Sequence, residues 1–281
     1  ATTRFPIDVE SFLALKSRAR STSPPAAAAE AVADRRTARA TTEAVPEAAL
    51  AAAAPSAAVA APLALVANFA GIDFNGSFPY DATLAAGPDH VMASVNTRVA
   101  FYAKATGALV LQRTLTQWFS SVITGAKIFD PKVLYDQFAG RWVLLAVALA
   151  ENPNRSWFLL SVSATADPRG TWFNYAMDAT RDGTTATNNW ADYPALGVDN
   201  QALYITANMF RFGGAFQYAK LRVIPKTAPY AGNPIAFRDF VRLLNDDGSS
   251  AFTVQPCHTF GAPGAEYLVT RHGGVDIVVH N

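Results

Sequence analysis

Cysteine is almost absent from this chain, and so is any excess of charge of one sign. Cys257 is the single cysteine, so no disulfide can form within the chain, and we expect it to be a small core residue. One cysteine fits a cytosolic protein or a secreted bacterial protein that folds without disulfides. Lys and Arg number 23 against 22 Asp and Glu, which leaves a net charge of +1. Nucleic-acid binding needs a basic face, and this balance argues against it.

Long apolar runs and the common catalytic motifs are also absent. A membrane-spanning helix needs about 20 consecutive apolar residues. Residues 48–66 come nearest, but alanine is only weakly apolar and Pro55 and Pro62 interrupt the run. The sequence has no G-x-S-x-G elbow, phosphate loop, dinucleotide fingerprint or H-E-x-x-H helix. We therefore expect no transmembrane segment and no cofactor other than, at most, a structural calcium ion.

The first 68 residues are predicted to form an arm or linker. Residues 4–20 are compatible with a short amphipathic helix, and residues 21–62 are an Ala- and Pro-rich segment of low complexity. Its side chains are too small to build a core, which favours a tether; the alternative is an arm that docks on another chain. The chain starts at Ala1 without a basic and apolar leader, an end that signal-peptide cleavage would leave. A secreted or cell-surface protein is therefore expected.

From residue 69 onward the sequence changes to an all-β pattern. Short runs of apolar, β-branched and aromatic residues are bounded by Gly, Pro, Asn and Asp, as in antiparallel sheets. The runs predict strands at residues 91–95, 99–102, 143–150, 157–162, 202–207, 216–223, 267–270 and 275–279.

A strand–turn–strand unit recurs along residues 69–281. Its copies start at Asp81, Asp130, Asp192 and Gln255, at intervals of 49, 62 and 63 residues. Such a period predicts a β-propeller, in which blades of about four strands are arranged around a channel. The first strand of each unit is expected to be short and to line the channel, with the four starting residues in one ring.

The number of units does not decide how the ring of blades is completed. Four units stand at the lower end of the roughly 4–8 blades of known propellers. We expect the chain to continue beyond Asn281. The alternatives are closure of the ring by another chain, or a closed ring of four blades.

The order of these motifs resembles that of secreted bacterial β-propellers of the broad sialidase-like class. The resemblance rests on GPDH at 87–90, DP at 130–131 with GRW at 140–142, and DYP at 192–194 with GVD at 197–199. The segment SATADPRGTW at 163–172 is similar to the Asp-box of that class, although its spacing departs by one residue. The resemblance implies a structural hairpin turn in which Asp167 binds turn amides, Gly170 has a positive φ and Trp172 packs between blades.

The recurring polar residues are the candidate site. Paired carboxylates hydrolyse glycosidic bonds, which makes Asp81, Asp130 and Asp192 catalytic candidates. With Gln255 they are also candidate ligand-binding residues. The alternative is structural, because aspartates at turns commonly accept hydrogen bonds from backbone amides. The resemblance would also imply three substrate-binding arginines and a Tyr–Glu pair, and the recurring positions carry neither.

Two groups of oxygen ligands are candidates for a calcium site, because Ca²⁺ prefers carboxylate and carbonyl oxygens. One is Asn189 with Asp192, and the other is Asp178 with Asp182.

The sequence therefore favours a binding or scaffold module that recognises a glycan or a protein partner. The alternatives are a glycoside hydrolase of sialidase-like fold and a structural subunit of a larger extracellular assembly. Catalysis is the less favoured reading, because fold signals are strong and catalytic motifs are absent.

Overall fold

The computed structural model describes residues 67–261, 265–272 and 276–280. Residues 69–281 belong to one unit. The predicted arm lies outside the described residues except for Ala67 and Asn68, and so does the predicted helix at 4–20. No helix in the described ranges has the length and apolar character needed to cross a bilayer.

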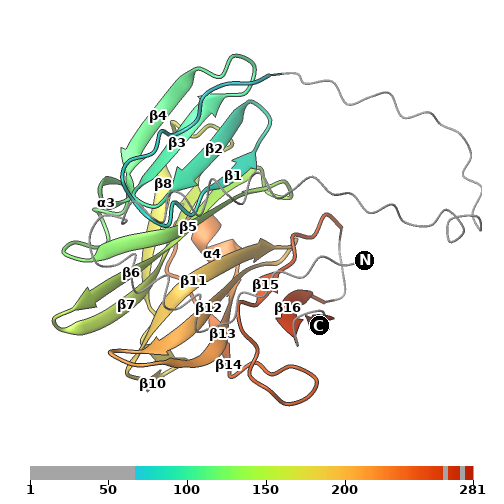
Figure 1. Cartoon of the computed structure of the whole chain (residues 1–281). Helices are drawn as coiled ribbons and strands as arrows, with labels where there is room; N and C mark the ends of the chain where they lie inside the picture. The colour runs from blue at the N-terminus through green and yellow to red at the C-terminus, as the bar shows by residue number, and fades with distance from the viewer. Residues whose placement is uncertain (1–66, 262–264, 273–275, 281) are drawn as a thin grey trace, which may run out of the picture. The chain divides into compact units, whose positions relative to one another are not determined.

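Four antiparallel sheets follow one another along this unit, and each strand pairs with the next strand in sequence (Figure 1). The first sheet holds β1 (Thr83–Ala86), β2 (His90–Val95), β3 (Arg98–Ala103) and β4 (Leu109–Thr114). The second holds β5 (Lys127–Asp136), β6 (Arg141–Glu151), β7 (Asn154–Ser163) and β8 (Trp172–Asp178). The third holds β11 (Asn189–Val198), β12 (Ala202–Arg211), β13 (Phe216–Pro225) and β14 (Arg238–Val241). The fourth holds β15 (Gln255–Pro256), β16 (Leu268–His272) and β17 (Asp276–His280).

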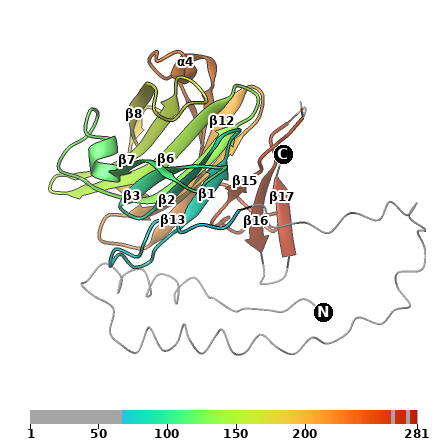
Figure 2. The ribbon, with the colours of Figure 1, turned by 90° about the horizontal axis from the view of Figure 1, so that it is seen from above.

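These sheets are the blades of a β-propeller, as the sequence predicted. The first strands of successive sheets lie beside one another: β1 by β5, β5 by β11, and β11 by β15. Figure 2 views the same sheets from above, with β16 and β17 beside β15. The eight predicted runs fall in β2, β3, β6, β7, β12, β13, β16 and β17. The expectation of short first strands is wrong for β5 and β11, which have ten residues each.

Small elements outside the four sheets were not predicted. They are α3 (Leu115–Trp118), α4 (Thr227–Tyr230) and the hairpin of β9 (Arg181–Asp182) and β10 (Thr185–Ala186). Helix α3 begins with a capping box, in which Thr114 and Gln117 exchange side-chain to backbone hydrogen bonds. Cys257, expected in the core, is a free thiol that is only partly buried.

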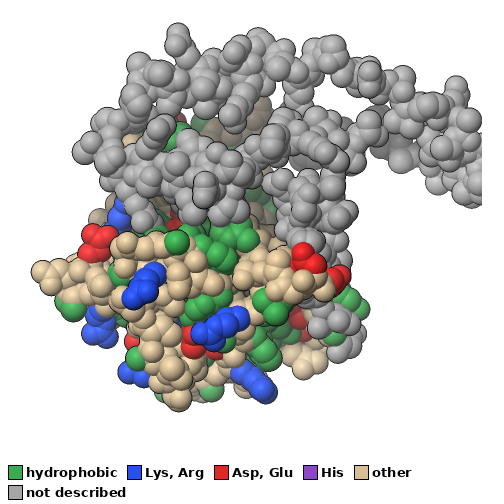
Figure 3. All heavy atoms as spheres, turned by 60° about the horizontal axis from the view of Figure 1, so that its bottom comes forward, with side chains coloured by type: hydrophobic (Ala, Val, Ile, Leu, Met, Phe, Trp, Pro, Cys, Tyr) green, Lys and Arg blue, Asp and Glu red, His purple; other side chains and the backbone are tan. Residues whose placement is uncertain are grey.

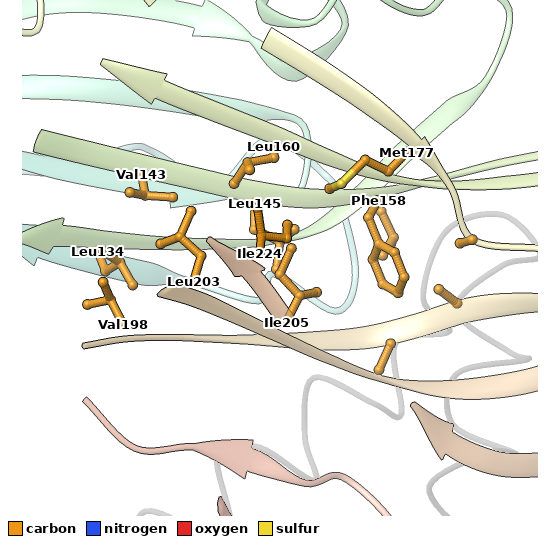
Figure 4. Packing of buried hydrophobic residues seen from close by; sticks show 14 of the residues in the cluster. Leu134, Val143, Leu145, Phe158, Leu160, Met177, Val198, Leu203, Ile205 and Ile224 are labelled. Carbon is orange, nitrogen blue, oxygen red and sulfur yellow. The ribbon is translucent and has the colours of Figure 1, made fainter. Parts of the chain in front are cut away.

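The second sheet is buried on both faces, which explains the uninterrupted apolar run of β6. Val143 and Leu145 point to the third sheet, where they pack in one cluster with Leu203 of β12 (Figure 4). Trp142 and Leu144, which alternate with them, pack in the cluster shared with the first sheet. Each such Leu or Val contributes about 1.5–3 kcal/mol through burial. Packing of sheet on sheet is therefore what holds the blades together.

The Asp-box-like turn joins β7 to β8. Oδ1 of Asp167 accepts the backbone N–H of Arg169 at 2.9 Å, as the resemblance implied. The ring of Trp172 lies 4.8 Å from that of Trp118 and 5.7 Å from that of Phe101 in the first sheet. These two expectations are confirmed. The expectation for Gly170 is wrong, because its φ is not positive.

Candidate functional site

One residue at the start of each sheet has a left-handed backbone. Its φ is +46° at Asp81, +50° at Asp130, +46° at Tyr193 and +55° at Thr253. In β5 and β11 this residue belongs to a bulge, where two residues face one on the neighbouring strand. The structural repeat therefore follows Asp81, Asp130, Tyr193 and Thr253.

The sequence alignment had the first two positions of this repeat right and the last two shifted. Asp192 precedes the left-handed residue by one position and pairs across the strands with Asn208. Gln255 follows the left-handed residue by two positions and pairs with Val269. The sequence alignment followed the polar residue type, and the left-handed residue is an aspartate only in the first two sheets and Tyr193 and Thr253 in the last two.

A chain of hydrogen bonds joins these positions from sheet to sheet. Asn96, which follows β2, donates from Nδ2 to Asp81 Oδ2 at 2.6 Å and accepts the N–H of Asp130 at 2.6 Å. Oδ2 of Asp130 in turn accepts the N–H of Tyr193 at 3.0 Å. The structure thus brings Asp81 and Asp130 together, and Asp130 links the second sheet to the third.

The next step of this chain uses an asparagine again. Oδ1 of Asn208 accepts the N–H of Thr253 at 2.8 Å, and its Nδ2 donates to the hydroxyl of Thr253 at 3.0 Å. Asp130 and Asp192 are only 3% and 2% exposed, which leaves little carboxylate surface for a substrate. These positions therefore join neighbouring blades.

Two of the predicted calcium ligands do meet, but around a lysine. Tyr218 donates to Asp182 Oδ2 at 2.6 Å and receives Nδ2 of Asn189 at 3.2 Å. The ammonium of Lys220 lies 2.8 Å from Asp182 Oδ1 with its side chain fully buried. Burial lowers the pKa of Lys220, while Asp182 acts in the opposite direction. The positive charge at this position is supplied by the protein itself.

The other two predicted calcium ligands also have protein partners. Oδ1 of Asp178 accepts the N–H and the hydroxyl of Thr180 at 2.8 and 2.6 Å, and its Oδ2 lies 3.6 Å from Nε of Arg181. Asp192 is buried within β11. Throughout the described ranges, no three His, Cys, Asp or Glu residues are close enough together to share an ion.

A cavity of about 720 Å³ opens between the second and third sheets, and the sequence did not point to it. Its walls come from the turn between β5 and β6, the turn between β11 and β12, the end of β13 and α4. Its volume falls in the range of about 300–1,000 Å³ that is usual for small-molecule sites. The aromatic, amide and charged residues of its lining are Phe138, Asn200, Gln201, Tyr204, Lys226 and Tyr230.

A buried ion pair stands at one wall of this cavity, with Lys226 in the lining and Asp136 behind it. Nζ of Lys226 lies 2.8 Å from Oδ2 of Asp136, and the Asp136 side chain is fully buried. The hydroxyl of Tyr230 donates to the same carboxylate oxygen at 2.7 Å. Burial and the Asp136 charge raise the pKa of Tyr230 far above its usual value, so this hydroxyl keeps its proton. The ring of Phe138 lies 5.1 Å from the Lys226 ammonium, close enough for a cation–π interaction.

The two turns that border the cavity are built alike. Asp136 at the end of β5 accepts the N–H of Phe138 at 2.9 Å, and Asp199 after β11 accepts the N–H of Gln201 at 2.7 Å. Each aspartate thereby closes the turn after a first strand. The sequence repeat contained both turns. Lys226 was missed because no motif marks it and it reaches Asp136 from 90 residues away.

On the face shown in Figure 3, hydrophobic side chains lie at the surface between separate Lys and Arg side chains. On this face the basic side chains do not form one continuous patch.

Comparison with known proteins finds no matching family model and no matching curated protein. Solved structures with similarity include the arabinanase Arb43A of Bacillus subtilis, at 15% identity and a TM-score of 0.36 over 68% of this chain and 65% of that one. An alpha-L-arabinanase of Penicillium chrysogenum complexed with arabinobiose gives 11% identity and a TM-score of 0.44 over 72% and 61%. A mutant alpha-L-arabinanase of Cellvibrio cellulosa gives 14% and 0.37 over 71% and 68%.

The likeness in these comparisons concerns the fold alone. The similar chains named above are β-propellers of glycosidase type and are not sialidases. The propeller that the sequence predicted is carried by the four sheets of this chain, and the sialidase-like class stays a prediction. The matched part spans 65% and 61% of the first two of these chains.

Proposed function

We propose that this chain is a carbohydrate-binding β-propeller module and that the cavity between the second and third sheets binds a neutral sugar. The observation that carries the proposal is that Lys226, paired with the buried Asp136 behind it, lines one cavity together with the rings of Phe138 and Tyr230. We expect such a module to be secreted or to lie at the cell surface, where it would encounter polysaccharides.

The aromatic side chains suit the apolar faces of a sugar ring. The side chain of Phe138 is 38% exposed although it is large and apolar. Tyr204 and Tyr230 contribute further aromatic surface to the lining. Aromatic rings at the edge of a polar pocket combine apolar contact with hydrogen bonding, which a sugar requires.

The polar groups suit the hydroxyls. An ammonium has three N–H donors, and Lys226 uses two of them, on Asp136 and on the backbone oxygen of Asp199. The third N–H has no partner in the described part of the chain and is available to a sugar hydroxyl. Asn200 and Gln201 in the lining add amide groups that both donate and accept.

The charge balance favours a neutral ligand. Lys226 contributes the single formal charge of the lining, and the carboxylate of Asp136 compensates it. A charged ligand would lose its hydration without meeting an opposite charge, which is unfavourable. A uronic acid is therefore expected to bind more weakly than the corresponding neutral sugar.

Binding is favoured over hydrolysis. Glycosidases need two carboxylates placed on either side of the scissile bond. Asp136 stands behind the wall, where Phe138, Lys226 and Tyr230 all donate to it. The lining itself contains no Asp or Glu.

Isothermal titration calorimetry of the full chain tests the proposal. The ligands are neutral pentose and hexose oligosaccharides, arabinobiose among them, and matched uronic acids. We expect saturable binding of at least one neutral sugar and about tenfold weaker binding by Phe138→Ala, which corresponds to about 1.4 kcal/mol. Phe74→Ala is the control, since Phe74 is 65% exposed and does not line the cavity. Equal losses in both variants, or no binding of any neutral sugar, would reject this site.

A further inference from the structure

Glu266, just before β16, has a buried carboxyl group; the nearby N–H of Cys257 lowers its pKa slightly but makes its hydrogen bond to the carbonyl of Tyr267 at 2.9 Å. Both of its oxygens are inaccessible to solvent, and neither has a partner among the described residues. Buried polar groups are nearly always hydrogen-bonded, and a buried carboxylate without a partner is strongly unfavourable. Glu266 does not line the cavity. It also lies outside the hub, by which we mean the left-handed residues Asp81, Asp130, Tyr193 and Thr253 at the starts of the sheets.

The carboxyl lies in the contact between the third and fourth sheets. It faces Gly197 of β11: a Cβ added there would be 3.3 Å from Glu266 Oε1 and 2.5 Å from Cβ of Pro256 in β15. Only a glycine fits such a close approach. The carboxyl of Glu266 therefore lies where β11 of the third sheet contacts the fourth sheet.

The group that faces Glu266 most strongly is another carboxylate. Asp199 is fixed by the N–H groups of Gln201 and Ala202, both at 2.7 Å, and by the hydroxyl of Tyr204 at 2.9 Å. Burial, and after it the charge of Asp199, raise the pKa of Glu266 to about 7. Two negative charges at this contact would repel each other across a poorly hydrated space.

The other titratable groups around this carboxyl stay neutral near pH 7. Burial raises the pKa of Tyr204 and that of the Cys257 thiol, so both keep their protons. His258 is turned to Oε1 of Gln137 at 2.9 Å, and burial lowers its pKa. No cation is therefore placed to compensate an ionised Glu266 in the described part of this contact.

We infer that protonation of the Glu266 carboxyl controls how tightly the fourth sheet packs against the third. With a proton on its carboxyl, Glu266 lies against Gly197. Ionised, the carboxylate is driven toward water, away from Asp199, and the fourth sheet loosens from the third.

The direction of the pH effect follows from linkage. A carboxyl whose pKa is raised in the closed state holds its proton there, while in the open state it titrates near its ordinary value of about 4.5. Closure is therefore strongest below about pH 4.5, weakens as the pH rises from there to about 7, and is constant above. We expect a change of about tenfold in the ratio of closed to open forms. This is less than the full shift implies, because Glu266 as a whole residue is only half-buried although its two oxygens are covered.

Deuterium exchange of backbone amides on the full chain measures this opening. The reporters are the Cys257 amide, which donates to the carbonyl of Tyr267 at 2.9 Å, and the amides of β16. After correction for the intrinsic rate, their protection should be about tenfold lower at pH 8 than at pH 5. Glu266→Gln should keep the high protection at both pH values. The control Glu151→Gln alters an exposed glutamate at the end of β6 and should behave as wild type.

The inference would be overturned if protection in the wild type does not change with pH. It would also be overturned if the Glu266→Gln variant shows the same change with pH as the wild type. Because a substitution at this contact can disturb folding, the wild-type carboxyl is also followed directly by ¹³C NMR. A titration midpoint near 7 supports the inference, and a midpoint below 5 overturns it.

Discussion

The ammonium of Lys226 lies 2.8 Å from the carboxylate of Asp136, 90 residues earlier in the chain, and it ties the third sheet to the second. Both side chains are buried, at 8% and 0% exposure. Because removal of one partner leaves an uncompensated buried charge, Lys226→Met should lower the free energy of unfolding by about 3–5 kcal/mol. Urea denaturation monitored by tryptophan fluorescence measures this.

A matched control is the ion pair of Arg169 with Asp167, which is 67% and 44% exposed. Arg169→Met should leave the urea midpoint almost unchanged, because water screens exposed pairs. The double variant Asp136→Asn with Lys226→Met should be more stable than Lys226→Met alone, since it removes the remaining charge. A double variant as unstable as the sum of the single ones would contradict this account.

Gly87, before β2, allows the first sheet to approach the second. A Cβ at this position would lie 2.5 Å from Cζ2 of Trp142, which is fully buried. Gly87→Ala should therefore overpack this contact and cost about 1–3 kcal/mol in the free energy of unfolding. Gly71→Ala is the control, because nothing lies within 4 Å of the added atom. Thermal unfolding in which both variants retain the wild-type midpoint would show that the contact relaxes freely.

The blades were predictable from the sequence because their signal is local. The run at 143–150 is apolar without interruption since β6 is covered on both faces, and the turn aspartates recur with the same period as the sheets. The strands β4, β8 and β14 were missed. Their residues are mostly exposed or half-buried, as the pattern of Leu109–Thr114 shows, and they lack a continuous apolar run.

The site was harder to predict because it depends on distant residues. Asp136 appeared in the sequence as a turn residue, and nothing near it announced Lys226 or Tyr230. The hub position was found at Asp81 and Asp130, where the left-handed residue is an aspartate, and shifted at Tyr193, where it is not. Spacing locates a repeated position only as long as the residue type repeats with it.

Asn96 is expected to be the most sensitive link at the hub. It binds Asp81 through Nδ2 and the N–H of Asp130 through Oδ1, both at 2.6 Å, and is itself buried. Asn96→Ala would leave a buried N–H without an acceptor, which costs about 1–3 kcal/mol in the free energy of unfolding. Asn233→Ala, at an exposed position, should show no such loss in urea denaturation. Similar midpoints for the two variants would mean that the sheets are held at the hub by other contacts.

Arg222 and Asp239 hold the outermost strand β14 to β13 through a two-pronged ion pair. Nε and the terminal nitrogen Nη2 of Arg222 donate to the two carboxylate oxygens at 2.7 Å each, and the side chains are 0% and 2% exposed. Arg222→Lys keeps the charge but offers no planar pair of donors, so we expect a loss of about 1.5–3 kcal/mol in the free energy of unfolding.

The same pair should give a pH-dependent contribution to stability. Burial by itself would raise the pKa of Asp239, but the hydrogen bonds from Arg222 outweigh it and the pKa is lowered. A carboxyl with a lowered pKa stabilises the fold above its unfolded value of about 3.8, and this stabilisation is lost as the pH falls through the folded value. Asp239→Asn should therefore be less stable than wild type at pH 7, and the difference should shrink below about pH 4. Urea midpoints measured from pH 3 to pH 7 decide this, and a difference that stays constant over that range would show that Asp239 is not ionised in the folded protein.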